Sequence, residues 1–213
     1  KLIYPAMQVA DIFFQGIHIA HAGLDQRKAH VVARDVALQL KVKPLLNKKK
    51  EKIKPIAIHH HLLLGLGKPS LWPVPKEQLQ ELWSALKMSK SNPETCVFIH
   101  DAPENIRRKL QNAFCPEGEI IFNPVLDWAK HLIFRDNHAK LVVERPAKFG
   151  GAVTYDSYTK LEHDFNEKKL HPLDLKKAVA EKLIAILEPA RKHFAQPVVK
   201  KLQEEMNALT ITR

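Results

Sequence analysis

The opening of the chain is almost entirely apolar, and its spacing predicts a buried helix. Residues 2–19 carry Asp11 as their only carboxylate, and Pro5 suits a first helical turn. At about 100° per residue, Tyr4, Gln8 and Asp11 share one narrow face, while apolar residues occupy most of the rest. A helix that is apolar on most sides is a buried helix. We therefore expect the polar stripe to face an interior cavity, where internal hydrogen bonds or a polar ligand satisfy it.

The next segments predict an α/β arrangement. Gly23 breaks the first pattern, and residues 26–40 predict a second helix with Asp25 as its N-cap. Residues 53–66 predict a buried strand with its exit loop. Between helix and strand, residues 41–54 hold seven lysines against one glutamate, so they contribute +6 of the net charge of +11. A loop is the natural form for such a run.

The remainder of the chain has a mostly helical pattern. A Pro-rich linker, a short amphipathic helix and a polar loop are predicted at residues 68–75, 79–86 and 87–93. Asp101 and Glu104 resemble a capping box, and Pro189 is expected to break the longest helix. Further helices are predicted at residues 101–114, 123–133, 158–165, 171–187 and 198–207, with a strand at 141–144.

Composition limits the class of protein. The 213 residues are 45% hydrophobic and 27% charged, which is a globular balance. The sequence has no apolar run of the roughly 20 residues that a membrane span needs and no secretory signal, and Cys96 and Cys115 form no metal-binding pair. A reducing cytoplasm is therefore expected. The positive charge favours a polyanionic partner, most commonly nucleic acid, although a solvated basic surface without a ligand is the alternative.

Two short segments carry candidate chemistry. After Gly23, the start of a helix lets backbone N–H groups approach a ligand closely, so that Asp25 can take ribose hydroxyls and Gln26 can reach the cavity; a plain N-cap is the alternative for Asp25. Lys87 and Lys90, set among hydroxyls, can fold over a triphosphate and stabilise the charge on departing pyrophosphate. The alternative is a solvated basic loop.

Several segments resemble one family. Lys87–Ser91 is KMSKS, the second signature of class I aminoacyl-tRNA synthetases, and YPAMQVAD and GLDQRKAH resemble tyrosyl-tRNA synthetases of the archaeal and eukaryotic type. The similarity continues, in order, through the segments at residues 92–119, 123–134, 145–151 and 170–192.

The resemblance implies a fold and a reaction. Residues 1–86 would be the C-terminal half of a Rossmann-type catalytic domain, residues 87–100 the KMSKS loop and linker, and residues 101–213 a mostly α-helical anticodon-binding domain. The enzyme would activate L-tyrosine with ATP, accompanied by Mg²⁺, and transfer the tyrosyl group to the 3′ end of its tRNA. The resemblance also implies a cytoplasmic homodimer at full length.

The resemblance assigns roles to individual residues. Tyr4 and Gln8 would contact the amino group of tyrosine, Asp11 its phenolic hydroxyl, and Gln26 the same pocket. Lys87 and Lys90 would act on the phosphates during catalysis. The residues implied at ATP are Gly23, Asp25, His30, Met88, Ser89, Lys90 and Ser91, with core packing as the alternative for His30.

A second set of roles concerns tRNA. Arg27 and Lys28 would face the acceptor end, Phe149 would stack on the first anticodon base, and Asp174 would bind its guanine edge with support from His171. Core packing is the alternative for Phe149, and a favourable helix-dipole charge is the alternative for Asp174.

One departure from the family concerns the HIGH signature, which the chain does not contain. His59-His60-His61 lacks its glycine, and consecutive histidines on a strand point to alternating faces, so we do not expect a metal site there. We expect the missing half of the fold upstream of Lys1, and little catalysis from this chain alone. A tryptophanyl-tRNA synthetase and a non-catalytic tRNA-binding module remain as alternatives.

Overall fold

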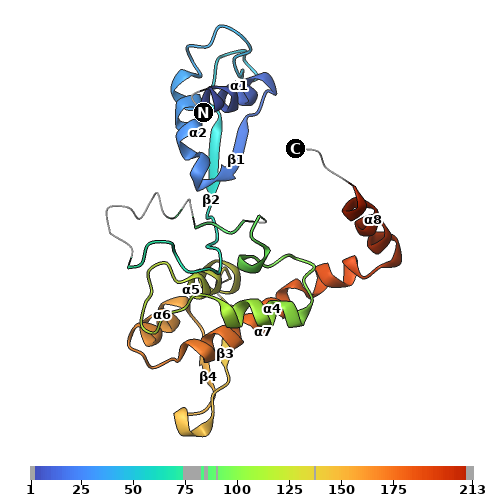
Figure 1. The fold of residues 1–213 in the computed structure, drawn as a ribbon. Coiled ribbons are helices and arrows are strands. Elements are labelled where there is room, and N and C mark those ends of the chain that lie inside the picture. Colours follow the sequence, from blue (N-terminus) through green and yellow to red (C-terminus); the bar gives the residue numbers. More distant parts are fainter. Residues whose placement is uncertain (1–2, 74–82, 84–85, 90, 137, 210–213) are drawn as a thin grey trace. The chain divides into compact units, whose positions relative to one another are not determined.

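The computed structural model describes residues 3–73, 83, 86–89, 91–136 and 138–209. The chain divides into two compact units, Lys1–Leu62 and Leu63–Arg213 (Figure 1). The contacts thus group residues from Leu63 onward with the second unit, whereas the predicted first domain extends to residue 86; the domain assignment itself stays a prediction. Within the described ranges, no helix is long and apolar enough to cross a membrane.

The first unit is a small parallel sheet with helices packed on one face. Ala20 is buried against these helices, and the small side chains of Ala29 and Ala33 let one helix lie close to Ile12 of the other. The strands pair in parallel, with Ile19 opposite Ile56. In chain order the elements are α1 (Tyr4–Phe14), β1 (Ile19–Gly23), the 3₁₀ turn η1 (Leu24–Gln26), α2 (Arg27–Val36) and β2 (Ile56–His60).

Three predictions for this unit were wrong. Helix α1 is buried only along Val9, Ile12 and Phe13, and strand β2 is not buried, since Ile56 is 56% exposed. The reason is that, among the described residues, other elements pack against only one side of α1 and only one face of the sheet. Asp25 is also not an N-cap, because the turn η1 runs directly into α2 and places Gln26 at that position.

The second unit has its core around Trp128. Its indole Nε1 donates to the carbonyl of Leu64 at 2.7 Å, while the carboxylate of Asp127 accepts from the backbone N–H of Leu64 at 3.0 Å. These two bonds attach the segment that follows Leu62 to the second unit. Its elements are η3 (Pro93–Thr95), α4 (Pro103–Asn112), α5 (Pro124–Trp128), the π-helical turn η4 (Ala129–Ile133), β3 (Leu141–Val143), η5 (Ala147–Phe149), β4 (Val153–Tyr155), α6 (Tyr158–Asn166), α7 (Pro172–Phe194) and α8 (Pro197–Ala208).

Most elements of this unit lie where the pattern predicts them, with two corrections. Asp101 does not cap α4; its carboxylate accepts from the N–H of Phe98 at 3.0 Å and pairs with the buried ammonium of Lys109 at 2.7 Å. Pro189 does not end α7, which continues to Phe194. Pro189 is exposed, so the carbonyl that loses its helical donor faces water and not the core. The predicted helix 79–86 lies largely outside the described residues.

Candidate functional site

Two of the four residues predicted to bind tyrosine, Gln8 and Gln26, meet at the carboxyl end of β1. The side-chain Nε2 of Gln8, on α1, donates a hydrogen bond to Oε1 of Gln26, at the last position of η1. Both side chains are half-buried. Because Gln8 lies between Tyr4 and Asp11 on the helix, this bond places the polar stripe of α1 beside the turn that follows the strand.

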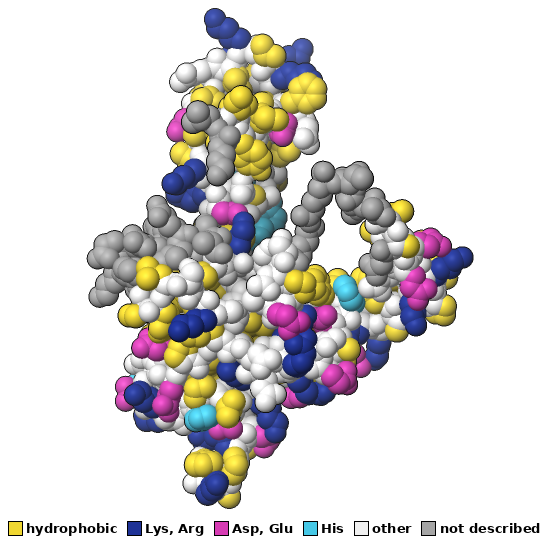
Figure 2. Space-filling view, in the orientation of Figure 1, with side chains coloured by type: hydrophobic (Ala, Val, Ile, Leu, Met, Phe, Trp, Pro, Cys, Tyr) yellow, Lys and Arg dark blue, Asp and Glu magenta, His cyan; other side chains and the backbone are white. Residues whose placement is uncertain are grey.

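The stripe does not face an enclosed cavity within the first unit. Tyr4 is 63% exposed and Asp11 is exposed, together with the apolar neighbours Met7 and Phe14. Figure 2 shows hydrophobic side chains grouped on the surface of this unit. The expectation of a buried helix is therefore corrected to a helix with one packed face and one open face, and the polar stripe lies on the open side.

Gly23 is required by the packing of its own chain. A Cβ at this position would lie 2.6 Å from Cδ2 of Leu62 and 2.7 Å from Oδ1 of Asp25, closer than real side chains approach. The close approach predicted for a ligand is thus made, in this structure, by two side chains of the first unit. Arg27 and Lys28 follow on the first turn of α2, both exposed.

His30 is buried on α2 and pairs with a histidine of the adjacent strand. Its Nδ1 lies 3.0 Å from Nε2 of His59. Burial, and secondarily the neighbouring His59, lower the pKa of His30 below its usual value of 6.5. On the opposite face of β2, Nδ1 of His60 lies 3.1 Å from Nε2 of His21. Consecutive histidines therefore do alternate between faces, and the histidine partners of His59 and His60 were not predicted from the pattern.

The first two residues of the KMSKS segment pair with the backbone of Leu63 and Leu64, within the second unit. Lys87 forms an isolated antiparallel bridge with Leu64, and the N–H of Met88 donates to the carbonyl of Leu63 at 2.7 Å. Ser89 and Ser91 are exposed, and the N–H of Ser91 donates to Oγ of Ser89 at 3.3 Å. Lys90, the residue expected to matter most, lies outside the described residues.

The predicted anticodon residues occupy two places in the second unit. Phe149 ends the 3₁₀ turn η5 within the connection of the β3–β4 hairpin, where it is 59% exposed with the ammonium of Lys148 4.9 Å from its ring centroid. Gly150 has φ +90°, which lets the chain reverse directly after Phe149. Core packing is thereby excluded for Phe149, and its ring is available to stack on a base.

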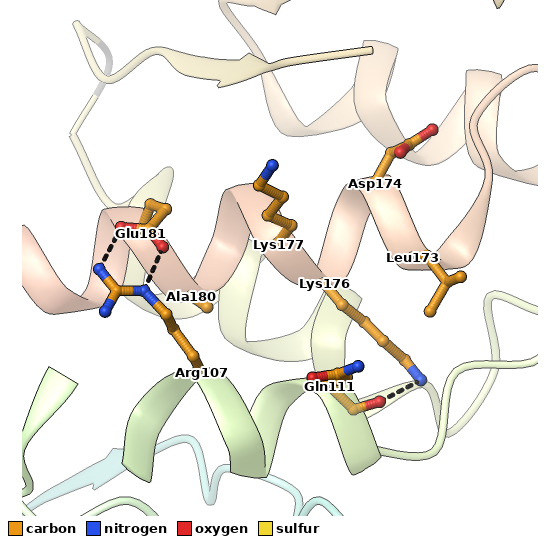
Figure 3. A pocket seen from close by; sticks show the side chains of 8 residues that line it. All are labelled: Arg107, Gln111, Leu173, Asp174, Lys176, Lys177, Ala180 and Glu181. Carbon is orange, nitrogen blue, oxygen red and sulfur yellow. Dashed lines mark hydrogen bonds and ion pairs between the residues drawn. The ribbon is translucent and has the colours of Figure 1, made fainter. Parts of the chain in front are cut away.

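Asp174 lies on the first turn of α7, at a cavity of about 430 Å³ between α4 and α7 (Figure 3). Its carboxylate makes no hydrogen bond or ion pair with any other described residue, whereas His171 is engaged as the N-cap of α7, with Nδ1 accepting from the N–H of Leu173 at 3.2 Å. The cavity is lined by Arg107, Gln111, Leu173, Asp174, Lys176, Lys177, Ala180 and Glu181.

Basic residues that the sequence analysis missed line the same cavity as Asp174. Arg107 and Glu181 form a two-bond ion pair, at 2.6 and 3.1 Å, and this hydrogen bonding lowers the pKa of Glu181. Lys176 donates to the carbonyl of Gln111 at 3.1 Å. In Figure 3, Lys177 points to the same side of α7 as Asp174. A carboxylate with neighbouring cations suits a nucleotide, whose base edge donates and whose phosphate is anionic. The pattern Asp-Leu-Lys-Lys was the signal available in the sequence.

The two cysteines take no part in this chemistry. Cys96 and Cys115 are buried free thiols, and burial raises the pKa of Cys115 to about 11. A thiol of such high pKa stays protonated near neutral pH and is a poor nucleophile.

Known proteins are similar to this chain in sequence and in fold. Residues 1–188 match the family model of tRNA synthetases class I (W and Y). The tyrosine–tRNA ligase of Thermococcus sibiricus is 58% identical over 217 residues, covering 100% of this chain and 56% of the relative. A crystal structure of tyrosyl-tRNA synthetase complexed with L-tyrosine from Pyrococcus horikoshii is 58% identical with a TM-score of 0.84, covering 91% of this chain and 52% of that one.

The comparisons also bear on the tryptophan alternative. A tryptophanyl-tRNA synthetase structure from Aeropyrum pernix K1 is 19% identical with a TM-score of 0.57, a likeness of fold alone. The chain spans about half the length of the curated relatives it matches. The family match, in contrast, covers most of the chain, and the chain therefore belongs to the class I tRNA synthetases of the W and Y group.

Proposed function

We propose that this chain supplies part of a tyrosine–tRNA ligase. The observation that carries the proposal is the hydrogen bond between Gln8 and Gln26, which joins the polar stripe of α1 to the carboxyl end of β1. In open α/β sheets, ligands bind outside the carboxyl ends of the strands. The stripe therefore lies where an amino acid substrate is expected.

The chemistry of the stripe suits tyrosine. A phenol needs an apolar slot with an acceptor at its end, and Asp11 is the one carboxylate on a helix that is otherwise apolar and amide-bearing. Gln8 lies about one turn before Asp11 and Tyr4 about two turns before it, so both would then face the amino group of the substrate. A substrate without the hydroxyl would leave a carboxylate unpaired in a closed pocket, which is the basis for rejecting phenylalanine.

The open faces of the first unit indicate what completes this pocket. Parallel sheets are normally covered on both faces, yet Ile19, Ile56 and Ile58 are 57%, 56% and 48% exposed on the face away from the helices. We propose that residues 1–62 form the second half of a Rossmann-type fold, and that a segment present in the longer relatives covers this face and the stripe of α1. The second unit would bind the anticodon.

ATP is the second substrate of the proposed reaction. The tyrosine carboxylate attacks the α-phosphate, pyrophosphate leaves, and the tyrosyl group then passes to the tRNA 3′ end with release of AMP. Gly23, Asp25 and His30 are proposed for the nucleoside side, with Lys87–Ser91 for the phosphates. Asp25 supplies the one carboxylate in this set, which fits Mg²⁺, an ion held by one or two carboxylates together with substrate phosphates.

tRNA is the third proposed partner. The exposed ring of Phe149 supports stacking, and the unengaged carboxylate of Asp174 supports recognition of a guanine edge, which offers two adjacent donors. Arg27 and Lys28, exposed at the start of α2, are proposed for the acceptor end.

The test is ATP–pyrophosphate exchange with tyrosine or tryptophan as the amino acid. It is measured with this chain and with a protein that carries it at the full length of the relatives. We expect tyrosine-dependent exchange from the longer protein and little from residues 1–213 alone. Exchange with tryptophan in preference to tyrosine would establish the alternative, and tRNA binding without exchange at either length would establish a non-catalytic module.

A further inference from the structure

The loop between α2 and β2 carries more than half of the net charge of the chain. Residues 41–54 contribute +6 of +11, and three of their lysines are consecutive. These three residues, Lys48, Lys49 and Lys50, form the end of a tight turn and are named here the lysine tip. All three are exposed. Neither the tyrosine pocket nor the anticodon group proposed above uses them.

The lysine tip is held in a defined conformation. The side-chain Oδ1 of Asn47 accepts from the N–H of Lys49 at 2.9 Å and from the N–H of Glu51 at 3.0 Å. Leu46 and Lys52 form an antiparallel bridge below the turn, and Lys50 takes the left-handed conformation with φ +63°. An Asx turn of this kind fixes the backbone, so the three ammonium groups project from a preorganised base.

Among the described residues, two further lysines of this loop have partners, whereas the lysines of the tip have none. The ammonium of Lys43 lies 3.9 Å from the ring centroid of Phe14, and that of Lys52 donates to the carbonyl of Leu40 at 2.7 Å. Lys48, Lys49 and Lys50 make no side-chain hydrogen bond or ion pair with any residue that the structure describes. Glu51, the one carboxylate of the loop, accepts from the amide of Asn47 at 2.8 Å instead.

Placement separates the lysine tip from the proposed ATP site. The loop enters β2 at Ile56, and the parallel register sets Ile56 opposite Ile19, the first residue of β1. The tip thus belongs to the amino end of the sheet, whereas Gly23 ends β1 at the carboxyl end, about 13 Å from Ile19 along the strand. In Figure 1 the loop projects from one end of the first unit, and Figure 2 shows Lys and Arg side chains at that end.

We propose that the lysine tip binds the phosphate backbone of tRNA. Three like charges on a convex turn cannot enclose a small anion, but they match the regularly spaced phosphates of a nucleic acid strand. Their mutual repulsion, which no ion pair with a described residue relieves, is offset when phosphates approach. This inference rests on the proposed function, because tRNA is the partner of the ligase, and it adds a contact that uses none of the acceptor-end or anticodon residues named above.

The experiment measures tRNA affinity over a range of salt concentrations. The test variant is Lys48→Gln/Lys49→Gln/Lys50→Gln in the whole chain, since glutamine removes the charge but keeps a polar, unbranched side chain, and the turn is held by backbone and Asn47 atoms. The matched control removes the same charge at three exposed lysines of the second unit, Lys160→Gln/Lys169→Gln/Lys200→Gln. Circular dichroism and thermal unfolding verify that both variants are folded.

We expect the slope of log K against log salt concentration to become shallower by about 2–3 in the tip variant, because each phosphate contact contributes roughly 0.7–0.9. At 0.1 M salt the affinity falls about ten-fold or more, and the control changes the slope by less than about 1. A tip variant with the slope of the wild type, or one matched by the control, overturns the inference alone. A wild-type chain that shows no tRNA binding overturns the inference together with the proposed anticodon role.

Discussion

Replacement of Asp174 by alanine separates a recognition role from a structural one. The carboxylate is half-buried on the first turn of α7 and has no partner among the described side chains. If it serves only the helix dipole, its removal costs about 0.3–1 kcal/mol of stability and leaves tRNA binding unchanged. If it accepts two hydrogen bonds from a guanine edge, binding weakens by about 1–3 kcal/mol, which is about five- to 150-fold.

The assay is fluorescence anisotropy with two tRNAs that differ only in the first anticodon base, guanine or adenine. The wild type prefers guanine, because adenine lacks the paired donors, and Asp174→Ala binds both tRNAs with similar, weakened affinity. Glu104→Ala, which removes another first-turn carboxylate on α4, is the control with an equal dipole cost and no effect on binding. Undiminished preference for guanine in Asp174→Ala, with a fall in stability alone, would refute the recognition role.

Three further predictions concern the packing that supports the two units. Gly23→Ala should lower the free energy of unfolding by about 1 kcal/mol, because the new Cβ displaces two side-chain ends; equal urea midpoints would contradict this. Because the pKa of His30 is lowered on folding, its contribution to stability is present above pH 6.5 and is lost as the pH falls toward the folded-state pKa. Urea unfolding between pH 7.5 and 5 should therefore show a flatter pH dependence for His30→Asn, whereas exposed His138→Asn keeps the wild-type dependence. Trp128→Phe leaves the buried carbonyl of Leu64 without its donor and should cost about 1–3 kcal/mol, which calorimetry would detect; an unchanged melting temperature would exclude a contribution from this bond.

The local sequence pattern was sufficient to predict the positions of helices in the second unit. The start at Asn123-Pro124 combines a capping side chain with proline at the first helical position, and the structure places the amide oxygen of Asn123 within 3.1 Å of the N–H of Val125. The apolar spacing of Tyr158, Leu161 and Phe165 likewise predicted α6. Where one element's own residues determine its ends and its buried face, the sequence contains the necessary information.

Predictions failed where the partner of a residue lies far away in the chain. Asp101 was assigned to a cap because Glu104 follows it, but a lysine on the helix competes successfully for the carboxylate. The apolar run 2–19 merged α1 with the start of β1, because a strand buried on one face and a helix cannot be separated by hydrophobicity alone. The exposure of the α1 stripe depends on which other segments cover it, and the hydrophobic periodicity of α1 contains no information about those segments.

The sequence named candidate site residues, but it did not reveal which other residues contact them. Gln8 and Gln26 do meet, although 18 positions separate them; the helix start after Gly23 indicated that Gln26 reaches the same cavity, and the family resemblance placed both residues at the substrate. The histidine partners of His30 and His60, and the basic lining near Asp174, arise from tertiary contacts that one sequence does not specify. The role of each residue in binding stays a prediction until it is measured.

The central claim is that the α1 stripe recognises the phenol of tyrosine through Asp11. The most direct measurement is the ratio of kcat/KM for tyrosine and phenylalanine in pyrophosphate exchange, compared between wild type and Asp11→Ala in a protein of the relatives' full length. Loss of a hydrogen bond to a charged acceptor predicts that this ratio falls by about ten- to 150-fold. An Asp11→Ala enzyme that discriminates against phenylalanine as well as the wild type would contradict the account.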